Sequence, residues 1–520
     1  MRTLMLFPLV LPWLGCSMVG AKHSDTGDVS QGLDENDTAD GWADTDADTD
    51  ADTDADVDAG DTADGDDTGD TTTDSGDTAE PDICDSALAE GITFYMSADD
   101  SNSQATPVLA RSEIDDGQQY RGRALAWEFL NYYDFDYTPA LDTPVRIAAQ
   151  MVPSVDFPGD LEIVVAVVAP ALTPLERAPL NLVFAVDTSG SMGGAGITMA
   201  QASMRSIAHQ LRDGDVVSVV TWATTTSTVI DGLEVSGPDD PDLLDVADGL
   251  TSGDSTDLSK GLATAYGLAE SHKAEGYANR VVLISDGGAN TGQTDEDLIG
   301  GHAAVQEADA IYLIGVGVGD ADAYSTELMD TVTDLGRGAH VFIDTTSEAA
   351  HQFDEDERFI ENMMVAATDV TLAMDLPANW VIDRFSGEEI STDPSDIVPQ
   401  NLAPNDQMLY HLTLRNCGGD ENAAFHFGVT STATDGTTTA TVLDTDVTTM
   451  SASGQTQVVK AVALVNAATA IQGVWALPSA DRKAYLEAVR DRVSVAADTL
   501  PDDADLAEVV NLLAAYASMF

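Results

Sequence analysis

Long apolar runs alternate with helix-like patterns between Pro179 and about Thr345. In the helix-like stretches, such as STDLSKGLATAYGLAESHK, apolar positions recur at the spacing of one helix face. Uninterrupted apolar strands separated by helices predict a largely parallel sheet that helices cover on both faces. The apolar runs are NLVFAVD, DVVSVVTWA, TSTVIDG, NRVVLISD, DAIYLIGVGVG and AHVFID.

Other parts of the chain follow different periods. Alternation of apolar and polar positions, with Asp435-Gly436 as a hairpin turn between two Thr-rich runs, predicts a β-rich domain. The stretch from Arg123 to Pro139 predicts a packed helix and turn, and residues 457–520 predict about three helices. The predicted strands outside the α/β region are 145–152, 161–168, 369–376 and 408–415.

The segment from Ser24 to Asp82 has a composition that cannot form a core. It contains 23 acidic residues and neither Lys nor Arg, with the near-repeat DTDADTDADTDADVDAG. Like charges repel, so we expect a disordered, extended tether. Alternating Asp residues also begin calcium loops, but the required Gly falls at Ala59 and no Glu closes the loop, which leaves only weak calcium binding as an alternative.

The net charge of the 520-residue chain is −70. Nucleic acid and anionic membrane surfaces would both repel such a chain, so neither is an expected partner. A solvated acidic surface is the simplest interpretation of this charge, and diffuse cation binding is the alternative.

The N-terminal sequence MRTLMLFPLVLPWLGCSM predicts an export signal, because its apolar stretch is too short for a permanent span. Its end, WLGC, resembles a bacterial lipoprotein cleavage box, in which Cys16 becomes the lipidated first residue. Ordinary signal cleavage after Ala21 is the alternative. We therefore expect an exported protein, lipid-anchored in the cell envelope at the outer membrane or cell surface.

In an oxidising envelope Cys84 and Cys417 can form a disulfide, and two independent buried thiols are the alternative.

Polar loops follow several of the apolar strands. In LVFAVDTSGSMGG, Asp187, Ser189 and Ser191 stand at alternate positions, so three oxygens can point to one place. Thr256 in GDSTDLSKGL and Asp286 in NRVVLISDGG add a hydroxyl and a carboxylate. Two carboxylates and three hydroxyls are suited to Mg²⁺ or Ca²⁺, with Mn²⁺ as a further alternative. A capped helix start could explain the DTSGS motif by itself, but it does not explain why Thr256 and Asp286 stand in two further polar loops.

On these residues, the region from about Pro179 to Thr345 resembles a von Willebrand factor type A domain. Asp187, Ser189, Ser191, Thr256 and Asp286 match its metal-ion-dependent adhesion site. The resemblance implies that a protein ligand supplies an acidic residue to a divalent cation. It also implies a Rossmann-like, doubly wound α/β fold.

The second loop departs from the family pattern. Asp254 and Asp257 stand near Thr256 where the family often has Gly and Asn, which shifts the preference toward calcium. Ser255 remains an alternative to Thr256. The flanking phrases LNYYDFDYTP and DLGRGAHVFIDTTSEA resemble exported bacterial proteins labelled calcium-activated chloride channel homologues.

We do not expect an enzyme. The eight histidines form no HExxH pair, and no Gly-x-Ser-x-Gly elbow occurs. The main hypothesis is metal-dependent binding of a protein ligand, a structural scaffold stabilised by the metal is the second, and a hydrolase with an unfamiliar site is the third. The expected organisation is a lipoprotein-type signal peptide (1–21), a disordered Asp/Thr-rich linker (22–82), an N-terminal flanking region with strands (83–177), a type A domain (178–347), a β-rich domain (365–450) and a C-terminal helical region (455–520).

Overall fold

A computed structural model describes residues 83–99, 103–223, 225–253, 258–287, 296–303, 310–322, 324–452 and 455–520. All described residues belong to one unit of the chain, Thr78–Phe520. The predicted signal peptide, the lipidation site Cys16 and the predicted acidic tether lie outside the described residues. They stay predictions.

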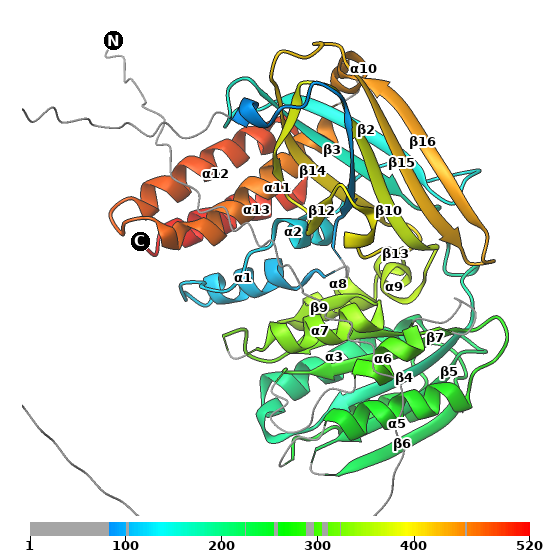
Figure 1. The fold of residues 1–520 in the computed structure, drawn as a ribbon. Coiled ribbons are helices and arrows are strands. Elements are labelled where there is room, and N and C mark those ends of the chain that lie inside the picture. Colours follow the sequence, from blue (N-terminus) through cyan, green and yellow to red (C-terminus); the bar gives the residue numbers. More distant parts are fainter. Residues whose placement is uncertain are drawn as a thin grey trace, which may run out of the picture. The chain divides into compact units, whose positions relative to one another are not determined.

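Strands from both sides of the α/β region form two antiparallel sheets (Figure 1). One sheet has the order β12-β1-β10-β15-β16, with β13 paired to β10, and the other has the order β11-β14-β3-β2. The predicted ranges 83–177 and 365–450 thus contribute to the same sheets. The strands are β1 Ile92–Ser97, β2 Arg146–Pro153, β3 Asp160–Val168, β10 Ala367–Leu376, β11 Trp380–Phe385, β12 Glu389–Ser391, β13 Gln400–Leu402, β14 Gln407–Asn416, β15 Ala424–Ala433 and β16 Thr438–Asp446.

The pairing of β3 with β14 joins segments about 250 residues apart in the sequence, from Asp160↔Arg415 to Val168↔Gln407. Apolar side chains from both sheets, including Met374, Tyr410 and Phe427, form one buried core. The alternating pattern predicts this core because side chains on alternate residues face the same side of a sheet.

Helices cover the other face of β3 and β14, where Val164, Ala166 and Leu409 contact them. The helices in contact with these strands are α2 Ala126–Tyr132 and α11 Thr456–Gly473. The helices α1 Ala105–Asp115, α12 Arg482–Thr499 and α13 Ala504–Ala517 pack against them and against one another. The stretch Thr456–Ala476 is long and apolar enough to cross a membrane, with a mean hydropathy of 1.4, but 61% of it is buried inside the molecule. We interpret it as a core helix, because it packs against α2, α12 and β3.

The α/β domain has a six-stranded sheet in the order β6-β5-β4-β7-β8-β9, parallel except for β6. The strands are β4 Leu180–Asp187, β5 Val216–Trp222, β6 Thr226–Glu234, β7 Ala278–Ser285, β8 Ile311–Val318 and β9 His340–Ile343. The helices are α3 Ala195–Gln210, α4 Pro241–Gly249, α5 Leu258–Ser271, α6 Glu296–Ala303, α7 Thr326–Gly336, α8 Thr346–Phe353 and α9 Asp356–Met363.

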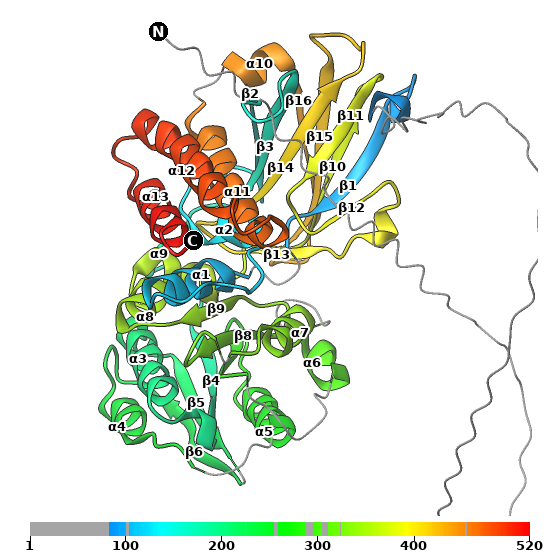
Figure 2. The same ribbon diagram turned by 90° about the vertical axis from the view of Figure 1, so that its left-hand side faces the viewer.

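Both faces of this sheet are covered, which explains the continuous apolar runs. Figure 2 shows α3, α4 and α8 on one side of the strands and α5, α6 and α7 on the other. In β4, Leu182 and Phe184 pack against the first layer, while Val183 and Ala185 pack against the second. The predicted fold class is confirmed: a doubly wound α/β domain with additional β-rich sheets and C-terminal helices.

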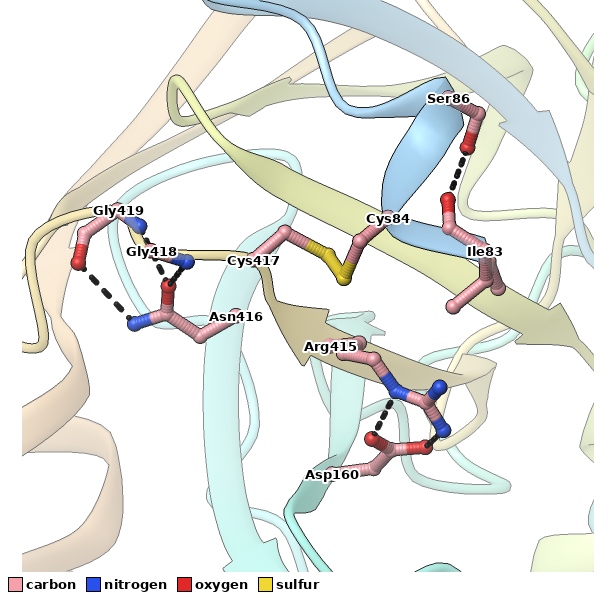
Figure 3. Close-up of a disulfide and its surroundings, with 9 residues drawn as sticks. All are labelled: Ile83, Cys84, Ser86, Asp160, Arg415, Asn416, Cys417, Gly418 and Gly419. Carbon is pink, nitrogen blue, oxygen red and sulfur yellow. Dashed lines mark hydrogen bonds and ion pairs between the residues drawn. A yellow bond between two sulfur atoms is a disulfide. The ribbon is translucent and has the colours of Figure 1, made fainter. Parts of the chain in front are cut away.

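A disulfide joins Cys84 to Cys417, with their Cα atoms 5.4 Å apart (Figure 3). The sequence left open whether these two cysteines form a disulfide or are separate buried thiols, and the structure contains the disulfide. Arg415, just before Cys417, binds both carboxylate oxygens of Asp160 at 2.7 and 2.9 Å. The side-chain oxygen of Asn416 accepts the backbone N–H groups of Gly418 and Gly419. The disulfide therefore attaches the first described segment to a well-bonded end of β14.

Replacing Cys84 and Cys417 together with serine is expected to lower the free energy of unfolding by about 2–5 kcal/mol, because the closed loop is long. Denaturant unfolding of the double variant beside the oxidised native protein measures this loss. Ser86→Ala, which removes only a local hydrogen bond to the Ile83 carbonyl, is the control. Equal midpoints for the double variant and the control would contradict the prediction.

Candidate metal centre

The candidate site lies where the order of the sheet reverses. From β4 the chain continues to β5 on one side, and β7 lies on the other side. In doubly wound sheets, ligands bind at the carboxyl ends of the strands at this switch point. Asp187 ends β4 and Asp286 directly follows β7. Because β4 and β7 are parallel and Val186 is paired with Ile284, these ends are adjacent.

Asp187 is fully buried. One carboxylate oxygen accepts the backbone N–H of Ser189 at 2.8 Å, and the other accepts the Ser285 hydroxyl at 2.9 Å. Burial raises the pKa of Asp187, and the nearby Asp286 adds to this effect. Within the described part of the chain, Asp187 has no basic partner. A buried carboxylate in such surroundings is stabilised by a nearby cation.

The two serines of the first loop lie next to Asp187. The Ser189 and Ser191 hydroxyl oxygens are 3.1 Å apart, with Ser189 buried and Ser191 exposed. Asp286 is half-buried, and a Cβ atom added to Gly319 would lie 3.5 Å from its Cβ. The structure thus brings two predicted hydroxyls beside one predicted carboxylate, and it places the second carboxylate on the adjoining strand end.

Thr256 and the neighbouring Ser255 lie outside the described residues, so the position of the second loop stays a prediction. The residues on either side of this loop are described. The Gly253 N–H donates to the carbonyl of Thr188 at 2.6 Å, which fixes the preceding segment against the first loop. On the following side, Leu258 is buried at the start of α5.

Trp222 and Gly261 keep α5 close to the end of β5. The Trp222 side chain is fully buried, and a Cβ on Gly261 would come within 2.8 Å of its ring. The Trp222 carbonyl accepts both the N–H and the hydroxyl of Thr188, at 2.8 and 2.9 Å. This contact positions the loop after Asp187.

Ser285 is a site residue that the sequence analysis missed. Besides donating to Asp187, its hydroxyl accepts the N–H of Gly287 at 3.2 Å, so it connects the two acidic loops. Gly287 has φ +71°, and an added Cβ would meet the Ser325 carbonyl at 2.7 Å. Parallel pairing of the two central strands could have revealed Ser285, because it places this residue beside Asp187.

The residues present fit a hard divalent cation. Carboxylate and hydroxyl oxygens are the ligands that Mg²⁺ and Ca²⁺ prefer, and the buried Asp187 carboxylate supplies the charge. Among the described residues, no group of three His, Cys, Asp or Glu side chains could hold a metal. A metal here therefore depends on the hydroxyls of Ser189 and Ser191 as well as on the acids.

The sheet order and the polar strand ends define this region as an α/β domain with a candidate ligand site at its switch point. Residues 181–356 match the sequence model of the von Willebrand factor type A domain. The chain therefore contains a von Willebrand factor type A domain, a class that commonly mediates protein–protein interaction and often binds a divalent metal. The matching model names a domain rather than an enzyme.

The chain is also similar in part to other known proteins. The chain is 30% identical over 244 residues to the uncharacterized protein YfbK of Escherichia coli (strain K12), over 45% of this chain and 42% of that protein. It is 24% identical over 238 residues to the uncharacterized protein sll0103 of Synechocystis sp., over 46% and 54% of the two chains. The chain thus matches about half the length of these relatives. A solved von Willebrand factor type A structure from Catenulispora acidiphila shares 15% identity, with a TM-score of 0.43 over 68% of this chain and 87% of that one.

Proposed function

We propose that this protein is an envelope lipoprotein whose type A domain binds a protein ligand through a divalent cation. Asp187, Ser189, Ser191, Thr256 and Asp286 hold the cation, and an acidic residue of the ligand completes its coordination. The observation that carries the proposal is the fully buried Asp187 carboxylate, beside two hydroxyls and without a basic partner among the described residues. The protein acts by binding and not by catalysis.

The proposed location depends on the N-terminal sequence. Lipidation at Cys16 anchors the chain, and the acidic segment holds the folded unit away from the membrane surface. The mass of the purified N-terminal peptide tests this part. A peptide that begins at Cys16 and carries acyl chains supports anchoring, and one that begins after Ala21 contradicts it.

The sequence resembles exported proteins labelled calcium-activated chloride channel homologues. From this resemblance the proposal takes only the similar domain organisation. The one described helix that could span a membrane by length and composition is mostly buried in the core. We do not include channel activity in the proposal.

Immobilised full-length protein is expected to capture a specific envelope protein in Mg²⁺ or Ca²⁺ and to release it in chelator, because the metal bridges the two partners. The captured protein is identified by mass spectrometry and then mixed in purified form with the native chain. Asp248→Ala is the control for the Asp187→Ala variant of this experiment, because it removes an exposed carboxylate of the same domain.

A purified partner that binds equally well in chelator would contradict metal-dependent adhesion.

The second candidate function is a scaffold in which the metal only stabilises the domain. It is favoured by the close bonding of Asp187 to Ser189 and Ser285, which couples the site to the fold. Under this alternative the metal raises the melting temperature and leaves partner binding unchanged.

A further inference from the structure

A cavity of about 360 Å³ lies between the N-terminal helices and the α/β domain. Glu113 of α1, Tyr120 of the α1–α2 connection and Glu128 of α2 line one side. Tyr324 and Asp330, from the segment that ends β8 and begins α7, line the other side. None of the described residues of the candidate metal centre lines this cavity, so it is a separate feature.

The inner wall carries three carboxyl groups. Glu128 is 3% exposed and accepts the backbone N–H of Thr106 at 2.5 Å, while Glu113 and Asp330 are half-buried. Among the described residues, none of these three acids forms an ion pair. Burial raises the pKa of Glu128 to about 7, with a contribution from Asp330, and it also raises the pKa values of Glu113 and Asp330. A cation that enters the cavity would therefore find carboxylates that form no ion pair.

Buried His340 does not supply this counter-charge. Its ring lies between the Ser103 hydroxyl at 3.3 Å and the Tyr324 hydroxyl at 2.8 Å. Burial lowers the pKa of His340 to about 4, so the ring is neutral near pH 7. The interior of the cavity therefore has acidic and neutral groups.

Positive charge is found at the rim. Arg121 and Arg123 both line the cavity and are exposed. The Arg121 guanidinium lies 3.8 Å from the centre of the Trp475 ring, which holds it in place. Arg123 is near enough to oppose the rise in the pKa of Asp330. The exposed Asp322 also lines the cavity, so the interior is acidic and the rim carries two arginines and one acid.

We infer that this cavity binds a small zwitterion of the amino-acid class, with an ammonium group facing Glu128 and Asp330 and a carboxylate facing Arg121 and Arg123. The separation of charge between interior and rim selects a ligand with opposite charges at its two ends. The volume accommodates a molecule of this size. This binding is independent of the proposed metal-dependent function.

Isothermal titration of the full-length protein with L-lysine at about pH 8, where most of Glu128 is ionised, tests the inference. Cadaverine, which lacks the carboxylate, and hexanoate, which lacks both ammonium groups, are the comparison probes. We expect lysine to bind more tightly than cadaverine, and we expect no binding of hexanoate. Arg123→Gln should weaken lysine binding and should not weaken cadaverine binding.

Glu128→Gln is expected to weaken lysine binding at least about tenfold, because it removes a charge-assisted hydrogen bond from a buried site. Asp330→Asn is a second variant, at a half-buried position that tolerates change more readily. Glu421→Gln, an exposed exchange of the same kind in the β-rich domain, should bind lysine like the native protein. Asp187→Ala should also bind lysine normally, which separates this inference from the proposed function.

Three results would overturn the inference: no heat from lysine or cadaverine up to about 10 mM, hexanoate binding as tightly as lysine, or native affinity in Glu128→Gln and Asp330→Asn. Far-ultraviolet circular dichroism of each variant identifies a loss of affinity caused by unfolding. If Glu128→Gln unfolds, the Asp330→Asn and Arg123→Gln titrations decide the outcome.

Discussion

Replacing Asp215 with alanine is expected to lower the free energy of unfolding of the type A domain by about 3–5 kcal/mol. The Asp215 carboxylate is fully buried and accepts hydrogen bonds from the two terminal nitrogens of the Arg177 guanidinium, at 3.0 and 2.5 Å. It also accepts the backbone N–H groups of Leu180 and Arg212 at 2.8 and 2.9 Å, so it joins the beginnings of β4 and β5. Without it, the buried guanidinium, 1% exposed, loses its counter-charge.

The matched control is Asp248→Ala. Its partner Arg205 and Asp248 itself are 46% and 59% exposed, so the expected loss is below about 1 kcal/mol. Denaturant unfolding gives the free energies, and hydrogen exchange of the β4 and β5 amides locates the effect. The double replacement Arg177→Met with Asp215→Leu should recover most of the stability, because no unpaired charge remains. Equal losses for Asp215→Ala and Asp248→Ala would show that the buried pair does not support the sheet.

Replacing Asp187 with alanine is expected to weaken divalent-metal binding at least about hundredfold, and with it any metal-dependent partner binding. Asp187 is the buried carboxylate of the site, and few charged oxygens are available to replace it. The fold should survive, because burial disfavours the charged carboxylate in the absence of metal. Titration calorimetry with Mg²⁺, Ca²⁺ and Mn²⁺ measures the affinities, and the melting temperature with and without metal measures the coupling to stability.

The results for Asp187→Ala also separate the two candidate functions. Loss of both metal binding and partner binding supports adhesion through the cation. Loss of the metal-induced rise in melting temperature, with partner binding unchanged, supports the scaffold. Native metal affinity in this variant would contradict both, because both place the cation at Asp187. Asp248→Ala should retain native metal affinity, since it lies on α4 and its carboxylate is bonded to Arg205.

Local sequence patterns were sufficient for much of the fold. The continuous apolar runs predicted β4, β5, β7 and β8 because each strand is buried on both faces of its sheet. Strict alternation predicted β10 and β14 in the β-rich sheets. The type A motif predicted the polar loops that follow β4 and β7, and its metal ligands stay a prediction.

The sequence by itself determined most strands and helices of the α/β domain, because they follow from the local period of the backbone. It also predicted that Asp187, Ser189 and Ser191 lie together by assuming an extended loop, whereas Gly190–Met192 form a short 3-10 helix. Only the tertiary structure decided which strands are neighbours. It placed Ser285 beside Asp187, paired β3 with β14, joined Cys84 to Cys417 and enclosed the cavity between α2 and α7. The physical reason is that these contacts connect residues from about 100 to more than 300 positions apart, and their partners are selected by the packing of the whole chain.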